Sequence, residues 1–313
     1  MHPYHLNIQI KPYAETLDCN DKLLFIGSCF SEHISYKLTE IQLDINSNPN
    51  GTIFNPVSLA QPIIRFLNNT LYTENDLIEN NGNHYSIHHH SKLFNADKTD
   101  LLNLLNKKQE AFEEQLKTAK WLFITFGSAW VYSLKSNQTI VANCHKIPQN
   151  NFEKRLLNIE EISTIWAPLL AKLKINYPAL NIVFTVSPVK HLRDGVHENN
   201  LSKSTLLLAI NSLLNTKIMY FPAYELVVDD LRDYRFYESD CAHPNAMAID
   251  YVFDKFKEAY FSQNMNSISI EILKYLQLKN HKPISTTGKE YTQYIEAKEA
   301  QLKKVQSYIP FFK

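Results

Sequence analysis

The chain has 313 residues, of which 44% are hydrophobic, so it is long enough to bury one large core. Lysine and arginine together number 32, as do aspartate and glutamate, and no long basic run of the kind that binds nucleic acid is present. No apolar stretch approaches the roughly 20 residues needed to cross a bilayer, and the N-terminal residues lack the basic start and apolar core of a secretory signal. We therefore expect a cytoplasmic protein without nucleic-acid or membrane partners.

Short apolar runs alternate with amphipathic stretches along the chain. The apolar runs predict strands at residues 22–26, 43–45, 122–126, 182–186 and 218–221. The amphipathic stretches predict helices at residues 31–41, 56–67, 97–119, 159–173, 201–214 and 245–261. Alternation of this kind favours an α/β fold, in which helices cover both faces of a parallel sheet as a three-layer αβα sandwich. Residues 131–141 alternate around a polar turn and predict a hairpin.

Two segments stand apart from this alternation. Residues 70–98 are polar, and we interpret them as an irregular insertion over the sheet edge, with the His88-His89-His90 run in a solvated loop rather than in a ligand set. Residues 266–313 predict a charged helical extension outside the main sheet. The sequence thus indicates a main domain over residues 1–265 and a C-terminal helical extension.

Reactive or polar groups follow several of the predicted strands, where ligands bind in open parallel sheets. The first strand is followed by Gly27-Ser28-Cys29, which opens a helix. Because a helix N-terminus stabilises a thiolate, we expect the pKa of the Cys29 thiol to be lowered. The turn containing Gly51 follows the second strand and could point an amide at a developing oxyanion.

The later strands add further groups. Gly127 and Ser128 follow the third strand, and the predicted hairpin leads on to Asn143, Cys144 and His145. After the last strand come Asp240 and, three residues later, His243. An aspartate in this position can orient a histidine that serves as the base for a nucleophile. Several basic residues could recognise an anionic or sugar substrate, although such charges are usually solvated or paired: Lys190, Arg193, Lys203, Arg232 and Arg235.

Several of these segments resemble one known family. The sequence Gly27-Ser28-Cys29-Phe30-Ser31 is similar to the name-giving motif of the GSCFA-domain proteins, which belong with the SGNH (GDSL-like) hydrolases. Further similar segments occur in the same order at residues 126–132, 143–146, 186–191 and 230–237, so that the resemblance spans about residues 20–260. It implies a flavodoxin-like parallel sheet and an acyl hydrolase or acyltransferase acting on an ester or thioester.

The resemblance also implies roles for individual residues. Cys29 lies where the SGNH nucleophile would be, with Ser28 as its rival, and Asp240 and His243 match the orienting residue and the base. Gly51 is the match to the oxyanion glycine. The asparagine of the family pattern is missing after Gly127, which leaves Ser128 or Asn143 as replacement donors, and His145 and His191 complete the candidate site.

Two other functions stay open at this point. A zinc site could draw on thiols and imidazoles, although their spacing is unusual for zinc: Cys29, Cys144, His145, Cys241 and His243. A non-catalytic binding module on the same scaffold is the second alternative, which the missing asparagine favours. The acyl-transfer hypothesis itself needs no metal or other cofactor. It predicts a small-molecule or sugar-linked acyl substrate, and the oligomeric state is not readable from the sequence.

Overall fold

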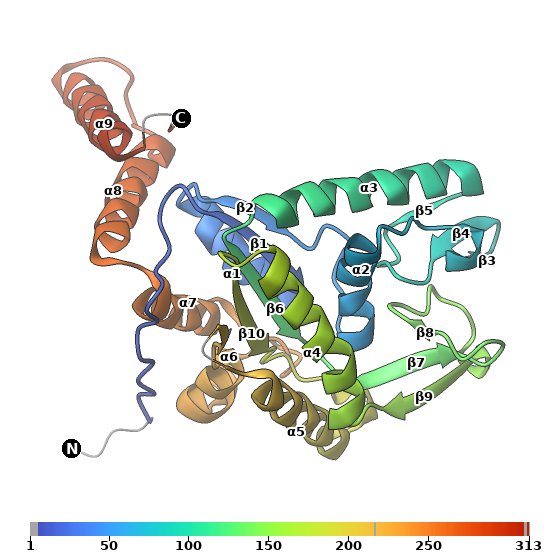
Figure 1. The fold of residues 1–313 in the computed structure, drawn as a ribbon. Helices are drawn as coiled ribbons and strands as arrows, with labels where there is room; N and C mark the ends of the chain where they lie inside the picture. The colour runs from blue at the N-terminus through green and yellow to red at the C-terminus, as the bar shows by residue number, and fades with distance from the viewer. Residues whose placement is uncertain (1–5, 216, 310–311, 313) are drawn as a thin grey trace.

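A computed structural model describes residues 6–215, 217–309 and 312. Its centre is a parallel sheet of five strands in the order β11-β10-β6-β1-β2 (Figure 1). The strands are β1 (Lys22–Gly27), β2 (Asp44–Ser47), β6 (Trp121–Phe126), β10 (Asn181–Val186) and β11 (Ile218–Tyr220). Counted among these five strands, the order is 2-1-3-4-5, which is flavodoxin-like. The predicted α/β fold class is confirmed.

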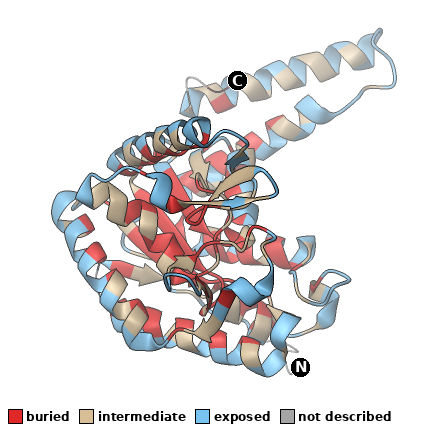
Figure 2. Cartoon of the chain, turned by 90° about the vertical axis from the view of Figure 1, so that its right-hand side faces the viewer, coloured by how far each residue is buried: buried red, intermediate tan, exposed pale blue. Residues whose placement is uncertain are grey.

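Helices cover both faces of this sheet. The helices on one face are α2 (Pro56–Asn68), α3 (Lys98–Thr118), α4 (Ile159–Asn176) and α5 (Val196–Leu213). The other face packs against α1 (Cys29–Glu40) and α7 (Ala246–Tyr260). Figure 2 shows the buried residues gathered between these layers. The chain therefore builds two apolar cores, one on each side of the sheet.

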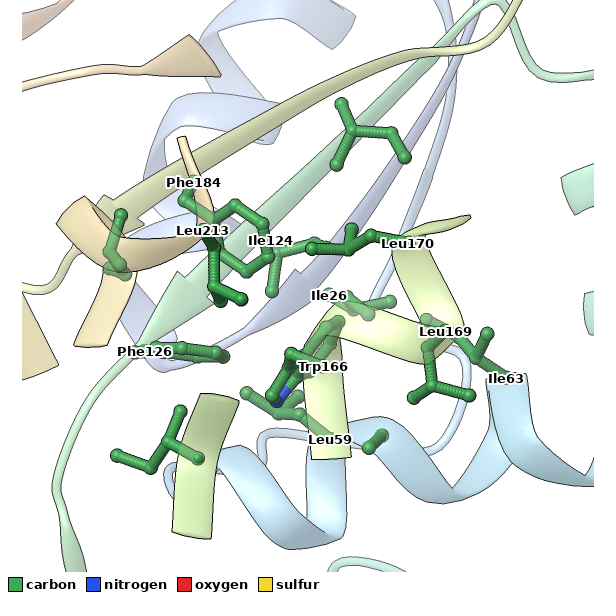
Figure 3. Close-up of a cluster of buried hydrophobic side chains, with 14 of the residues drawn as sticks. Ile26, Leu59, Ile63, Ile124, Phe126, Trp166, Leu169, Leu170, Phe184 and Leu213 are labelled. Carbon is green, nitrogen blue, oxygen red and sulfur yellow. The ribbon is translucent and has the colours of Figure 1, made fainter. Parts of the chain in front are cut away.

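The two cores are rich in aromatic rings. In the first, the Trp166 ring of α4 packs edge-on against Phe126 and Phe184 of the sheet, with ring centroids 5.3 and 5.4 Å away (Figure 3). In the second, the rings of Phe25 and Phe123 stack at 4.5 Å across β1 and β6. The burial of β1 and β6 explains their uninterrupted apolar runs in the sequence, because side chains on both faces of these strands enter a core.

The segment at residues 70–98 is not irregular as predicted. It holds the 3-10 turn η1 (Glu74–Asp76) and an antiparallel sheet of β3 (Leu77–Asn80), β4 (Asn83–Ser86) and β5 (Phe94–Asn95). The histidine run is not a solvated loop either, because His88 and His89 are only 7% and 0% exposed. His88 Nε2 lies 3.0 Å from an oxygen of Asp76, and His89 Nδ1 lies 2.7 Å from Ser86 Oγ. These polar partners make the burial of both rings tolerable.

A second small sheet follows β6. The predicted hairpin at 131–141 is confirmed as β7 (Trp130–Leu134) and β8 (Ile140–Val141), which pair antiparallel. The turn η2 (Gln149–Asn151) then leads into β9 (Phe152–Leu156), which pairs with the other edge of β7. Strand β9 is not predictable from the sequence pattern, because its residues, Phe-Glu-Lys-Arg-Leu, are mostly charged and only one is buried.

Short helical turns connect the later elements: η3 (Leu192–Asp194), α6 (Ala223–Glu225), the π-helix η4 (Leu226–Leu231) and η5 (Tyr234–Phe236). The chain then ends in a helical hairpin that extends away from the sheet, α8 (Gln263–Asn280) and α9 (Lys289–Tyr308) (Figure 1). Helix α8 begins before the predicted boundary at residue 266, and its Met265, Ile268 and Ile272 are buried in the second core. The extension is therefore anchored to the main body, and its separation as a domain stays a prediction.

Within the described ranges, every helix is too short or too polar to cross a bilayer. The prediction of a missing secretory signal rests partly on residues 1–5, which lie outside the described residues.

Candidate active site

The turn after β1 is built around a glycine that no other residue can replace without strain. Gly27 has a φ of +141°, and a Cβ added there would lie 2.3 Å from the carbonyl oxygen of Thr125 on β6. Its amide donates to Asn48 Oδ1 at 2.8 Å, which ties the turn to the end of β2. Strands β1 and β6 are neighbours in the sheet. Strand β2 lies on the far side of β1, whereas β10 and β11 follow on the far side of β6. The turn thus lies at the topological switch point, where open α/β sheets bind ligands.

The next two residues have different environments. The Ser28 side chain is completely buried, and its Oγ accepts a hydrogen bond of 3.3 Å from the Phe30 amide, which makes it the N-cap of α1. Cys29 is the first residue of the helix and is partly exposed. The hydroxyl of Ser28 therefore caps a helix, whereas Cys29 is partly accessible to solvent.

The expectation of a lowered pKa for Cys29 is wrong. Burial raises the pKa of this thiol, and the Glu32 carboxylate on the same helix raises it further. The backbone amides of Cys29 and Phe30 and the Lys203 ammonium act in the opposite direction, but they do not compensate. The thiol is consequently the resting form, and a base is needed to generate the nucleophilic thiolate.

Asp240 and His243 lie in contact on the loop before α7. Asp240 Oδ2 is 2.6 Å from Nδ1 of His243, and Oδ1 accepts the amides of Ala242 and His243 at 2.9 and 3.0 Å. These hydrogen bonds lower the pKa of Asp240 to about 2, so its carboxylate is ionised at neutral pH. The charged oxygen fixes the imidazole orientation and leaves Nε2 free to act as a base.

A network of electrostatic interactions links this pair to the Cys29 helix. His33, which follows Cys29 by one helical turn on α1, interacts electrostatically with His243. His243 also interacts with His191 after β10, and His191 in turn interacts with Lys203 on α5. The charge of Cys29 in turn raises the pKa of Lys203, against the larger effect of burial. These charges, which affect one another's pKa values, come from four separated parts of the chain: α1, the loop before α7, the end of β10 and α5.

Lys203, which the sequence suggested only as a basic residue that could bind an anionic or sugar substrate, is instead a buried residue of this site. Its side chain is 1% exposed, and Nζ donates to the carbonyl oxygens of Gly127 and Ser187 at 2.6 and 2.8 Å, at the ends of β6 and β10. Burial lowers the pKa of its ammonium to about 7. A signal was present in the sequence, because Lys203 lies at helical spacing from the buried Leu206 and Ile210 of α5.

The thiol and the imidazole do not touch in this structure. Among the described residues, no hydrogen bond joins Cys29 Sγ to His243, whose side chain is 49% exposed. Catalytic hydrogen bonds are often long before a substrate binds and tighten only in the complex.

Most of the backbone donors predicted for an oxyanion are already engaged. The Gly51 amide donates to Asn48 O at 2.8 Å, and the amides of Gly127 and Ser128 both donate to Phe54 O, at 2.8 and 3.0 Å. Gly51 has another use: with a φ of +80°, it leaves room for His90, whose Cβ would lie 2.4 Å from an added Cβ. These three amides would have to change partners before they could bind an oxyanion.

The remaining predicted residues lie in two places. Ser128, Asn143 and His191 line one cleft, and Asn143 Oδ1 there accepts from Ser91 Oγ at 2.6 Å. His145 is 1% exposed, and its ring packs against Tyr85 of β4 at 5.0 Å, so the structure gives it a packing environment.

The alternative of a zinc site receives no ligand set. Across residues 6–215, 217–309 and 312, no three or more His, Cys, Asp or Glu side chains are arranged to hold a metal ion. Cys29 opens α1 and His243 lies on the loop before α7, whereas Cys144 and His145 lie on the segment that follows β8.

Comparison with known proteins places the chain in one family. The family model described as the GSCFA family matches residues 22–256. No curated protein matches the chain.

Three solved structures are similar at low identity. A carbohydrate esterase family 3 protein from Talaromyces cellulolyticus is 7% identical, with 75% of this chain and 94% of that chain covered and a TM-score of 0.35. A family two carbohydrate esterase from Clostridium thermocellum is 11% identical (86% and 67% covered, TM-score 0.37), and an acetyl xylan esterase from Butyrivibrio proteoclasticus is 8% identical (80% and 64% covered, TM-score 0.40). Because the family model spans most of the sequence, the chain is a member of the GSCFA family.

Proposed function

We propose that the protein is an acyl hydrolase or acyltransferase that acts on an ester or thioester, with Cys29 as the nucleophile, His243 as the base and Asp240 as the residue that orients the base. The observation that carries this proposal is the 2.6 Å contact between Asp240 and His243, together with the effect of the His243 charge on the pKa of His33, one turn after Cys29 on α1. A carboxylate that holds Nδ1 leaves Nε2 as a proton acceptor, which suits a thiol whose pKa is raised.

The reaction has two balanced halves. His243 Nε2 accepts the thiol proton while Sγ of Cys29 bonds to the acyl carbon, and the carbonyl π electrons move onto oxygen. The tetrahedral intermediate then breaks its bond to the leaving alcohol or thiol, which takes the proton from His243. Water, or the hydroxyl or amine of an acceptor, repeats these steps on the thioester intermediate and restores the free thiol.

The start of α1 favours the negative charge that develops on the oxygen. As the first helical residue, Cys29 has an amide with no partner inside the helix, and it lies at the positive end of the helix dipole. One such donor contributes about 3 kcal/mol in a site without water. The side-chain NH2 group of Asn143 is a second donor in the proposal. Ser91 Oγ and the His145 amide both donate to the Asn143 oxygen, so the NH2 group is the part of this side chain that would face the substrate.

The burial of Ser28 supports Cys29 over Ser28 as the nucleophile. Ser28 Oγ is inaccessible and caps α1, so its loss should weaken the helix by about 1 kcal/mol without removing the reacting atom.

A second candidate function is a binding module without catalysis. Two observations favour it: no hydrogen bond joins Cys29 to His243 among the described residues, and the Gly51 amide is engaged by Asn48.

Hydrolysis of para-nitrophenyl acetate separates these functions. We expect Cys29→Ala and His243→Ala to lose turnover while their melting temperatures stay close to that of the parent. Ser28→Ala should keep turnover, and Cys19→Ala is the control for a thiol outside the site. Full activity of Cys29→Ala together with loss of turnover in Ser28→Ala would identify Ser28 as the nucleophile. A parent protein that does not hydrolyse the ester, and whose Cys29 reacts with a thiol-directed probe no faster than Cys19, would favour the binding module.

A further inference from the structure

A cleft of about 540 Å³ lies beside the candidate active site, which is within the range of small-molecule sites. Its walls come from β7, from the segment after β8 and from η3. Phe54 also lines it and connects it to the site: its carbonyl accepts the amides of Gly127 and Ser128, and the preceding residue, Ile53, donates its amide to the Gly27 carbonyl at 3.0 Å. A ligand in this cleft would therefore approach the turn after β1.

The charge of the cleft is positive. Lys146, Lys154 and Arg193 line it, against the single carboxylate of Asp194. Lys154 forms an ion pair with Asp194, whereas Lys146 and Arg193 make no ion pair with any described residue. Two cations without counterions on one concave surface attract a ligand that carries two negative charges, and lysine and arginine are the side chains that bind phosphate.

The aromatic wall of the cleft is held in place by one of these cations. Lys154 Nζ lies 4.7 Å from the centroid of the Trp130 ring and 5.6 Å from that of Tyr132, both on β7. The Trp130 indole donates to the Glu198 carbonyl at 3.1 Å, which fixes the plane of the ring. Rigid aromatic surfaces beside cations suit a ligand that combines a flat ring or sugar with an anionic group.

We propose that this cleft, called here the Trp130 cleft, binds the phosphate-bearing part of a phosphorylated acyl substrate, with Arg193 and Lys146 as the phosphate-binding side chains. The inference rests on the proposed function and narrows its substrate class. The ring-bearing portion of the substrate lies against Trp130, and the acyl group extends past His191 toward Cys29.

The first experiment measures binding without turnover. Titration calorimetry of the full-length Cys29→Ala variant with inorganic pyrophosphate should give saturable binding in the millimolar range or tighter at constant ionic strength. Adding Arg193→Met or Lys146→Met should weaken it about tenfold each. Adding Lys172→Met, an exposed lysine on α4 outside the cleft, should leave it unchanged. Absence of saturation would overturn the proposal. So would an affinity of the Arg193→Met and Lys146→Met variants that equals the affinity of the Cys29→Ala protein without them.

A second arm tests the aromatic wall. A nucleoside diphosphate should bind the Cys29→Ala variant more tightly than pyrophosphate, and adding Trp130→Leu should remove that gain without changing pyrophosphate affinity. If Trp130→Leu leaves the affinity of the nucleoside diphosphate unchanged, the assignment of the ring-binding surface is wrong.

The third arm joins the cleft to the proposed chemistry. In the parent protein, pyrophosphate should inhibit para-nitrophenyl acetate hydrolysis competitively, and Arg193→Met should relieve the inhibition. Binding without any inhibition would show that the ligand is not part of the substrate. Because the first two arms use a variant without the nucleophile, failure of the esterase assay alone would count against the proposed catalysis and leave the binding site standing.

Discussion

The carboxylate of Asp240 lies 2.6 Å from Nδ1 of His243, and the two residues are one short turn apart on the loop that precedes α7. The same carboxylate also receives the amides of Ala242 and His243, so the geometry of the pair is set locally by the backbone. Three hydrogen bonds keep the pKa of Asp240 at about 2. A permanently ionised partner places the imidazole proton on Nδ1, which is the tautomer that a general base requires.

Replacing Asp240 by asparagine should therefore reduce catalysis more than stability. An amide keeps an oxygen for the backbone hydrogen bonds but no longer selects the productive tautomer. We expect kcat for para-nitrophenyl acetate to fall by about 10²-fold or more. Steady-state kinetics together with thermal melting measure the two effects.

Asp233→Asn is the matched control for this variant. Asp233 is also exposed, also accepts a backbone amide, and pairs with Arg235 in the neighbouring segment, but it has no contact with His243. It should retain the parent's kcat. Equal losses in both variants would show that the loop, rather than the Asp240–His243 contact, determines the activity.

The reactivity of Cys29 should respond to the charge of Glu32. Burial and the Glu32 carboxylate both raise the pKa of the thiol. Glu32→Gln keeps an oxygen that can accept from Asn48 and Thr52, as Oε1 does at 3.0 and 2.6 Å, while it removes the negative charge. The variant should be alkylated at Cys29 by iodoacetamide several-fold faster at neutral pH, as followed by peptide mass spectrometry.

Two comparisons make that experiment decisive. The exposed Cys241 in the same molecule serves as the internal reference, and its rate should not change. In the parent protein the Cys29 rate should still be rising with pH where an ordinary thiol has levelled off. A Cys29 rate that Glu32→Gln leaves unchanged would contradict the electrostatic account of this thiol.

The buried ammonium of Lys203 should leave a signature in the pH dependence of stability. Its pKa is about 7 in the folded protein, against an ordinary value of 10.5. Between these values the unfolded chain holds the proton that the folded chain has released, so this group makes the free energy of unfolding rise with pH. Compared with Lys203→Met, the parent should gain about 1 kcal/mol per pH unit from about pH 7.5 to 9.5.

Urea denaturation of both proteins at a series of pH values measures this difference. At pH 7 the variant should already be less stable, because the carbonyl oxygens of Gly127 and Ser187 lose their donor, at a cost of about 1–3 kcal/mol each. Parallel stability curves for the two proteins would show that Lys203 does not change its protonation on folding.

Much of the fold was predictable because the three central strands, β1, β6 and β10, are buried on both faces. Runs such as 122–126 and 182–186 cannot be exposed without a large cost, and their alternation with helices leaves few arrangements open. Strand β9 was missed for the opposite reason, since it is a mostly charged and only partly buried edge strand held by backbone pairing to β7. The pairing partner of such a strand lies elsewhere in the chain, so the hydrophobic pattern of the strand itself does not predict it.

The candidate site was predictable only where its residues are neighbours in sequence. Asp240 and His243 form their contact within one turn, and the Cys29 turn follows directly from the end of a buried strand. The raised pKa of Cys29 and the burial of His89 depend on side chains that tertiary packing brings together. Local rules, such as the effect of a helix N-terminus on a thiol, are outweighed there by desolvation.

The two glycines Gly27 and Gly82 should respond very differently to alanine. Both have positive φ values, +141° and +72°, but an added Cβ at Gly27 would lie 2.3 Å from the backbone oxygen of Thr125, whereas at Gly82 nothing lies within 4 Å. Gly82→Ala should cost only the backbone strain of about 1–2 kcal/mol. Gly27→Ala must also push β1 away from β6, and we expect a loss of more than about 4 kcal/mol or failure to fold. Chemical denaturation of both variants tests this difference, and similar losses at the two positions would mean that the turn after β1 can relax and does not depend on its close approach to β6.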